Sequence, residues 1–292
     1  MPLKHRGLDS RLILLVLAAL ALAPVFARPS ISASQAILNY LFVVDITQSM
    51  NVRDYTIDGQ SIDRLNYVKL MLIKAIHELP CGSAAGLGLF TGWQTTVLFN
   101  PIEVCHNRRE VDNVLRHIDW RMTWAPQSNV ARGVQDALGK RVIRKHGASL
   151  VFFTDGDEAP PSGLTRLQAR RRLSHGKPQG ILVGVGDLHP SAVPLINQWG
   201  QMGGYFQSNG QPYLSSLKQD YLRKLGRALG LDYQQLQTDK QLLSNLRSNR
   251  YAKLRLARRT ISWGFGAVAL SLLIAVYLLD APLHHKRAQT GA

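Results

Sequence analysis

The sequence lacks clustered histidines and has little cysteine. Two of the 292 residues are cysteines, and the nine histidines show none of the paired spacings that zinc sites use. No segment resembles a base-reading nucleic-acid motif. These absences argue against a zinc centre and against sequence-specific nucleic-acid binding, and they leave the histidines as surface or packing residues.

The excess of positive charge is large, but most of it lies at the two ends of the chain. The net charge is +16, of which residues 1–30 contribute +3 and residues 247–292 contribute +7, leaving 16 − 3 − 7 = +6 for the middle. Both basic ends flank a long hydrophobic run, where Lys and Arg report membrane topology. The charge therefore indicates a membrane partner rather than a nucleic acid.

The first hydrophobic run, Leu12–Phe26, follows three basic residues. Its length predicts that residues 1–30 form a signal peptide, with cleavage after Val25-Phe26-Ala27, or an uncleaved signal anchor. In both cases the basic residues stay in the cytoplasm and the following domain is exported.

The second run, Ile261–Leu279, contains no charged residue and predicts a transmembrane helix. Residues 280–292 then form a short tail, and residues 209–260 form a helical, basic juxtamembrane region. Six basic residues between 247 and 259 would lie on the exported side, and taken alone they favour the opposite orientation. The first segment usually dominates topology, so we expect export.

The middle of the chain alternates apolar runs with amphipathic segments, which predicts an α/β domain with a doubly wound, mostly parallel sheet. Leu38–Val44 and Ala148–Thr154 read as buried strands, and Arg64–Leu79 as a helix that packs on the sheet. The other expected strands are Ala84–Phe90, Thr95–Ile102, Gly180–Val185 and Gly203–Phe206. The other expected helices are Arg109–Ile118, Val130–Lys145, Leu164–His175, Val193–Met202, Tyr213–Leu229 and Tyr233–Leu246.

The short turn before Thr95–Ile102 makes this strand antiparallel to its predecessor, and Pro101 places it at an edge of the sheet. In a regular hairpin centred on Trp93, the numbers of opposed residues add up to 186. Cys81 and Cys105 fulfil this condition, so we expect a disulfide between them if the domain is exported.

Five oxygen-bearing side chains follow the predicted strands. Asp45, Thr47 and Ser49 come directly after the first strand, Ser128 precedes a helix, and Asp155 follows the strand to which that helix leads. Ligands of such sheets bind beyond the carboxyl ends of the strands. Carboxylate and hydroxyl oxygens suit Mg²⁺ or Ca²⁺, so we expect a cation site there.

These motifs resemble the von Willebrand factor A (vWA) domain with its metal-ion-dependent adhesion site (MIDAS). Asp45-Ile46-Thr47-Gln48-Ser49 matches the family's Asp-x-Ser-x-Ser with one substitution, Ser128 stands in place of its threonine, and Thr154-Asp155-Gly156 is unaltered. The resemblance covers residues 36–208. It implies a Rossmann-like fold and a non-enzymatic, cation-dependent protein-binding module, whose partner supplies a carboxylate to the metal.

Four further segments resemble bacterial vWA proteins of methanol-oxidation clusters. They are Asn51–Tyr55, Leu79–Gly82, Arg121–Trp124 and Asp155–Pro161. This likeness implies an inner-membrane accessory protein that faces the periplasm and assists the assembly, maturation or metal loading of an enzyme such as a methanol dehydrogenase. Related membrane-anchored proteins accompany MoxR-type AAA ATPases, and the alternative orientation would make the chain a cytoplasm-facing partner of such an ATPase.

Loops that leave the same edge of the predicted sheet carry Asp54, Tyr55 and Trp124. We expect these residues to form a rim that faces the partner, because interface anchors are often aromatic.

An enzyme is the main rival interpretation. Asp155-Gly156-Asp157 resembles the Asp-x-Asp of haloacid-dehalogenase-type phosphatases, in which the first Asp is the nucleophile and the second the acid/base. That motif normally opens its domain, whereas here a long segment precedes it, and the phosphatase interpretation leaves Asp45 unexplained. We therefore expect no catalytic residues.

Overall fold

The computed structural model describes residues 10–27, 29–125, 127–145, 147–158, 180–197, 199–247, 251 and 253–287. The chain divides into two compact units. One unit combines the two ends of the chain, and the other spans Ala36–Leu254. The predicted basic helix Leu164–His175 lies outside the described residues.

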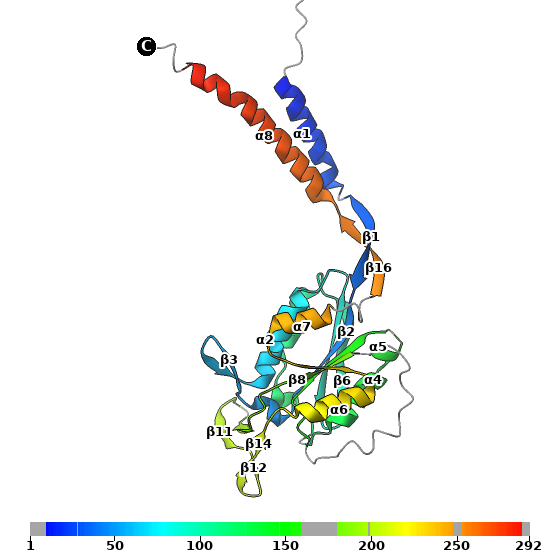
Figure 1. Cartoon of the computed structure of the whole chain (residues 1–292), viewed down its shortest axis with the longest axis vertical. Helices are drawn as coiled ribbons and strands as arrows, with labels where there is room; N and C mark the ends of the chain where they lie inside the picture. Colours follow the sequence, from blue (N-terminus) through cyan, green and yellow to red (C-terminus); the bar gives the residue numbers. More distant parts are fainter. Residues whose placement is uncertain are drawn as a thin grey trace, which may run out of the picture. The chain divides into compact units, whose positions relative to one another are not determined.

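A six-stranded sheet forms the centre of the larger unit (Figure 1). Its strands, in spatial order, are β15 (Asp232–Gln235), β8 (Gly180–Gly184), β7 (Ser149–Thr154), β2 (Asn39–Asp45), β5 (Ala84–Thr91) and β6 (Gln94–Glu103). All neighbours are parallel except β6, which is antiparallel to β5 at the edge. The predicted α/β class, with a mostly parallel sheet and one antiparallel edge strand, is confirmed.

Strand β2 shows why both faces of the sheet are covered. Every residue from Tyr40 to Asp45 is buried, and successive side chains of a strand point to opposite faces. Tyr40, Phe42 and Val44 belong to one hydrophobic core, and Leu41 and Val43 to another. A strand that is buried on both sides must be apolar throughout, which is why its sequence shows no alternation.

Among the described residues, three helices contribute to each core. On the side of Phe42 these are α2 (Arg64–His77), α3 (Arg108–His117) and α7 (Asp239–Leu246), and on the side of Val43 they are α4 (Val130–Gly139), α5 (Arg141–Arg144) and α6 (Gln219–Leu229). Helix α2 begins cleanly because the Asp63 carboxylate accepts a hydrogen bond from the backbone N–H of Asn66 at 2.8 Å.

The hairpin of β5 and β6 differs in detail from the regular one expected. Thr91 pairs with Gln94, so the residue numbers of paired residues add up to 185 near the turn. Two irregularities in the strand pairing change this sum to 187 where Ala84 pairs with Glu103. Cys81 and Cys105 lie beyond both irregularities and form a disulfide, with their Cα atoms 5.3 Å apart.

The segment between β8 and α6 corrects one prediction. Among residues 193–202, which were expected to be helical, Pro194–Ile196 form β10, 199–200 lie in a turn and Met202 begins β11, because Pro194 and the glycines nearby disfavour a helix. The short strands of this segment are β9 (Ser191–Ala192), β10 (Pro194–Ile196), β11 (Met202–Tyr205), β12 (Gln207–Ser208), β13 (Gln211–Pro212) and β14 (Leu214–Ser215). β10 pairs with β11 and β12 with β13 as hairpins, and β9 pairs antiparallel with β14, the last strand of the segment.

Strand β15 is a second correction, because its residues were expected to be helical. It joins the sheet beside β8, so the sheet extends beyond residue 208, where the sequence predicted the domain to end. Its sequence, Asp-Tyr-Gln-Gln, is polar because an edge strand is only partly covered. The hairpin β3 (Tyr55–Ile57)–β4 (Gln60–Ile62) and the short 3₁₀ helices η1 (Gln48–Asn51) and η2 (Trp120–Met122) complete this unit.

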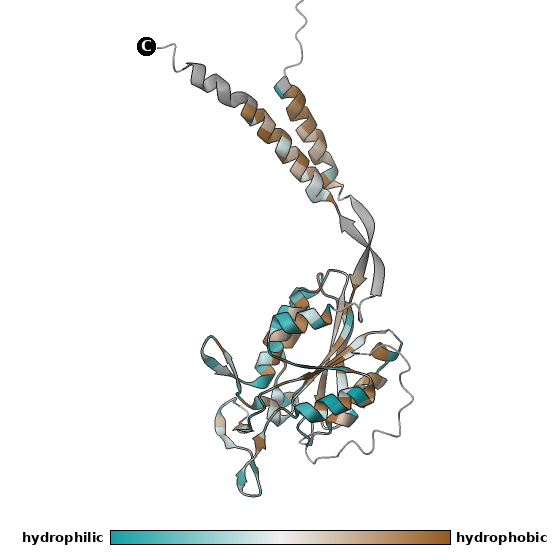
Figure 2. Cartoon of the chain, in the orientation of Figure 1, coloured by the Kyte–Doolittle hydropathy of each residue, from teal (hydrophilic) through white to brown (hydrophobic). Residues whose placement is uncertain are grey.

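In the smaller unit, α1 (Ser10–Phe26) and α8 (Ser262–Arg287) lie side by side (Figure 1), and β1 (Ser30–Ile37) pairs with β16 (Lys253–Thr260). The described side chains of both helices are largely apolar (Figure 2). Within the described part of the chain, no helix has the length and apolarity that crossing a membrane requires. The span predicted for residues 261–279 is therefore not confirmed.

Candidate functional site

Asp45 is the last residue of β2, and its carboxylate is completely buried. One oxygen, Oδ1, accepts hydrogen bonds from the backbone N–H of Thr47 at 2.9 Å and from its hydroxyl at 2.7 Å. The other oxygen, Oδ2, accepts one from the Thr154 hydroxyl at 2.7 Å. The carboxylate is thus fixed in orientation by the residues that follow β2 and by the neighbouring strand β7.

The loop after Asp45 brings two hydroxyls to the same place. Thr47 precedes η1, and its Oγ1 lies 3.3 Å from the Oγ of Ser49. The loop is held from outside by Thr123, whose hydroxyl donates to the backbone carbonyl of Ile46 at 2.7 Å. Asp45, Thr47 and Ser49 therefore form one connected cluster.

Asp155 reaches this cluster because β7 pairs with β2 in parallel. Val44 lies opposite Phe153, so Asp45 and Asp155 leave the sheet at the same edge. Asp155 is completely buried, and its Oδ1 accepts a hydrogen bond from the backbone N–H of Asp157 at 3.0 Å. Two buried carboxylates, each held by its own loop, thus lie near each other.

Ser128 lies in the loop before α4, next to the end of β5. It forms a bridge with Gly92, just beyond Phe90, and Phe90 lies opposite Asp45 in the sheet. The Ser128 hydroxyl is buried and has no hydrogen-bond partner among the described residues. A buried hydroxyl without a partner is costly, so this oxygen is suited to a ligand that the protein itself does not supply.

The electrostatics of the cluster favour a bound cation. Burial, and secondly the neighbouring charge of Asp155, raise the pKa of Asp45 to about 7, although hydrogen bonds from Thr154 and Thr47 oppose this. Burial and the charge of Asp155 also raise the pKa of Asp157. Buried carboxylates that repel one another, together with an unpartnered hydroxyl, fit the oxygen shell of a hard divalent cation.

Arg64, the first residue of α2, is a member of this site that the sequence analysis missed. Its side chain is completely buried, and its guanidinium lies 2.8 Å from Asp155 Oδ2 and 2.7 Å from Asp54 Oδ2. It also donates to the backbone carbonyl of Ser49 at 3.3 Å. The one sign in the sequence is an arginine in the first turn of a helix, where the helix dipole disfavours a cation.

Gly186 makes room for this arginine. Its φ of +109° favours glycine, and a Cβ there would lie 2.5 Å from Arg64 Nε. The glycine after β8 therefore leaves the space that the Arg64 guanidinium occupies in the site.

The segment between β8 and α6 is tied to the same carboxylates. The Ser215 hydroxyl accepts from Arg64 at 2.9 Å and donates to Asp155 Oδ2 at 3.3 Å. The Tyr213 hydroxyl donates to Asp157 Oδ1 at 3.0 Å. This segment is therefore positioned by the candidate cation site itself.

Two of the three residues expected on the partner-facing rim point inward. The Asp54 side chain is 5% exposed and paired with Arg64. Tyr55 stacks on Tyr67 with ring centroids 3.8 Å apart, and its hydroxyl donates to the carbonyl of Leu236. Their positions on the rim are thus corrected, since both belong to the packing beneath it. Trp124 is 48% exposed and remains available to a partner.

Comparison with known proteins agrees with this architecture. Residues 40–158 match the von Willebrand factor type A domain. The larger unit has a vWA-type fold. The match begins in β2 and ends three residues after Asp155, so it contains all five candidate ligands. No curated protein matches the chain.

Two solved structures share this fold. An aerotolerance-related membrane protein from Bacteroides fragilis NCTC 9343, solved with multiple mutations to serines, superimposes with a TM-score of 0.57 at 14% identity, covering 73% of this chain and 98% of that one. The conserved hypothetical protein BatB from Bacteroides thetaiotaomicron gives 0.55 at 14% identity, covering 72% and 95%. At this identity the likeness concerns the fold alone.

Proposed function

We propose that this protein binds a divalent cation at the carboxyl end of its sheet and uses it to bind a protein partner. The proposed ligands are Asp45, Thr47, Ser49, Ser128 and Asp155. The observation that carries the proposal is the buried, unpartnered hydroxyl of Ser128 beside this edge of the sheet. The vWA-type fold supports a role in protein interaction rather than in catalysis.

The charges around the site favour a partner that brings a carboxylate. Asp45, Asp54, Asp155 and Arg64 together carry −3 + 1 = −2 when ionised. A divalent cation neutralises this charge without reversing it, and it supplies a Lewis-acidic position for an incoming oxygen. Two carboxylates and three hydroxyls leave the shell incomplete, so a carboxylate of the partner can enter it. Either Mg²⁺ or Ca²⁺ suits such ligands.

The proposed setting is the periplasmic face of a bacterial inner membrane. The disulfide Cys81–Cys105 suits an oxidising compartment, and α1 and α8 expose apolar side chains that suit a lipid or protein environment. In this setting the protein assists the assembly or metal loading of an enzyme such as a methanol dehydrogenase, and an AAA ATPase of the MoxR type is a further candidate partner. Loss of the enzyme's metal content on deletion of the gene tests this role.

Calorimetric titration of the full-length protein with Mg²⁺ and Ca²⁺ tests the cation site. We expect saturable binding that Asp45→Ala weakens at least about 100-fold, because the change removes a buried carboxylate ligand. Asp112→Ala is the matched control, since Asp112 is paired with His77 on the surface of α2 and α3. Equal affinity in the wild type and in Asp45→Ala would refute the site.

A further inference from the structure

The segment between β8 and α6 has an unusual composition for a surface. Residues 190–217 contain no Asp, Glu, Lys, Arg or His, although the chain has 54 charged residues (35 + 19). Several of its large apolar side chains are exposed, namely Leu195, Trp199, Met202, Tyr205, Phe206 and Leu214. Few charges combined with exposed aromatic and methionine side chains are typical of the centre of a protein interface.

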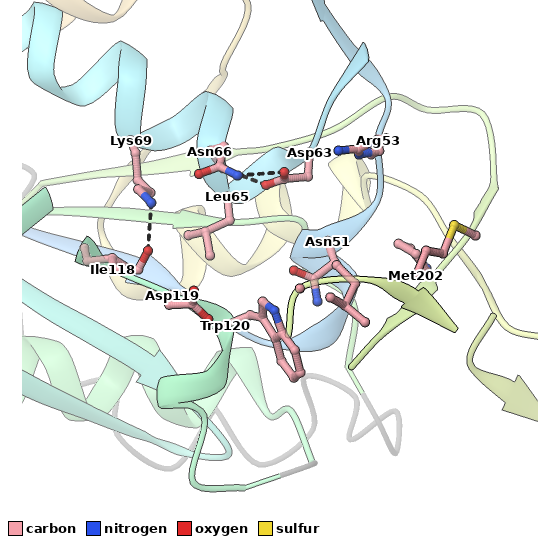
Figure 3. Close-up of a pocket in the computed structure, with 13 residues that line it drawn as sticks. Asn51, Arg53, Asp63, Leu65, Asn66, Lys69, Ile118, Asp119, Trp120 and Met202 are labelled. Atoms are coloured by element: carbon pink, nitrogen blue, oxygen red, sulfur yellow. Dashed lines mark hydrogen bonds between the residues drawn. The ribbon is translucent and has the colours of Figure 1, made fainter. Parts of the chain in front are cut away.

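A pocket of about 350 Å³ lies between this segment and the cation-binding loops (Figure 3). Leu65 of α2 and Trp120 of η2 line one side, and Ile196 and Met202 line the other. Ile196 and Met202 are directly opposed in the pairing of β10 with β11. Both sides are held by regular structure and are apolar at these positions, while polar and charged side chains line the rest of the pocket, namely Asn51, Arg53, Asp63, Asn66, Lys69 and Asp119.

Asn51 is the residue that points to a ligand. It lines the pocket and is only 3% exposed, yet its side-chain amide makes no hydrogen bond among the described residues. In Figure 3 this amide lies beside the Trp120 ring at the inner end of the pocket. The amide faces the space of the pocket, where its donor and its acceptor can both meet a ligand. One N–H and one C=O of an extended peptide backbone would satisfy both.

The pocket and the proposed cation site share the short helix η1. Asn51 and Ser49 both belong to η1, so they are separated by about 4 Å along a 3₁₀ helix axis. An extended chain advances about 3.3 Å per residue. One extended peptide can therefore place an apolar side chain in the pocket and a carboxylate at the cation if the two residues lie no more than about four positions apart.

We propose that the pocket binds a large apolar side chain of an extended segment of the partner protein, whose backbone pairs with the Asn51 amide and whose carboxylate coordinates the cation. This inference rests on the proposed function, because the cation must first be present to hold the carboxylate. The occupant is thus an acidic segment with one apolar anchor. The pocket gives specificity, whereas the cation gives the attraction that all carboxylates share.

Selection from random dodecapeptides displayed on phage tests the inference directly. The immobilised full-length protein is presented with the library in Mg²⁺, and bound phage are released with EDTA. We expect the recovered sequences to share an acidic residue and, within about four positions at a fixed spacing, a large apolar residue. Sequences that share only the acidic residue, or no enrichment at all, would overturn the proposal.

Variants in β10 and β11 can be compared with a matched control elsewhere in the larger unit. Ile196→Ser and Met202→Ser alter the pocket wall, whereas Leu98→Ser alters an exposed residue of β6 that does not line the pocket. Binding of a recovered peptide, labelled with a fluorophore and measured by anisotropy, should weaken about tenfold or more in the two pocket variants and stay unchanged in Leu98→Ser. Equal weakening in all three would contradict a role of the pocket.

Asn51→Ala separates this inference from the cation site. We expect the peptide to bind at least about fivefold more weakly, while calorimetry gives an unchanged affinity for Mg²⁺. Unchanged peptide binding in this variant would refute the backbone contact. Absence of Mg²⁺ binding in the wild type would instead refute the proposed function, so the two failures are distinguishable.

Discussion

The loops proposed to bind a cation and the segment 190–217 meet at the same edge of the sheet but are built in opposite ways. The described parts of the loops after β2 and β7 are buried, charged and connected by hydrogen bonds to Asp45 and Asp155. The segment 190–217 is uncharged and largely exposed. A buried charged cluster holds its geometry without a partner, whereas an exposed apolar surface gains free energy only when a partner covers it.

Stability should distinguish the two regions most strongly. Arg64→Met should lower the free energy of unfolding by about 3–5 kcal/mol, because it leaves Asp54 and Asp155 buried without their counter-charge. Urea denaturation measures this loss. Arg121→Met is the control, since its ion pair with Asp119 is exposed and should contribute little to stability. Similar losses in both variants would contradict the role given to Arg64.

The pH dependence should belong to the buried cluster alone. The pKa of Asp45 is raised from 3.8 to about 7, so in the cation-free protein this group binds its proton more tightly when folded. Its contribution to stability is full below about pH 4 and is lost as the pH rises through about 7. Unfolding measured without cation from pH 6 to 8 tests this sign, because carboxylates with a lowered pKa such as Glu103 act in the opposite direction only at lower pH, and a gain in stability over that range would contradict it.

The same proton should compete with the cation. Below about pH 7, cation affinity should fall by up to about tenfold per pH unit, because the carboxylate must be deprotonated to bind. Calorimetry at pH 5.5 and 7.5 measures the change. Peptide binding through the segment 190–217 should show no pH dependence beyond that of the cation, since that segment has no Asp, Glu, Lys, Arg or His.

A smaller effect is expected at the rim. Trp124→Ala should weaken partner binding severalfold, because a half-exposed aromatic residue loses contact area, and it should leave cation affinity unchanged. Anisotropy with a cation-dependent peptide and calorimetry with Mg²⁺ provide the two readings. A loss of cation affinity would place Trp124 in the site rather than on its rim.

The sequence predicted the parts of the molecule that depend on patterns of residues close together in the chain. Apolar runs such as Leu38–Val44 identify buried strands, and parallel strands end at a common edge, so the convergence of Asp45 and Asp155 could be anticipated. Arg64 could not be, because its role depends on ion pairs with Asp54 and with Asp155, and Asp155 lies 91 residues further along the chain. Pro194 alone could have warned against a helix over 193–202, and nothing in Asp-Tyr-Gln-Gln marks β15 as a strand.

Ser128 provides the most direct test of the account. Its buried, unpartnered hydroxyl destabilises the cation-free protein and stabilises the protein only if a cation binds there. Thermal unfolding of Ser128→Ala should therefore give a melting temperature equal to or above that of the wild type in EDTA, and a clearly smaller rise on addition of Mg²⁺ or Ca²⁺. The same rise in both proteins would contradict the assignment of Ser128 to a cation site.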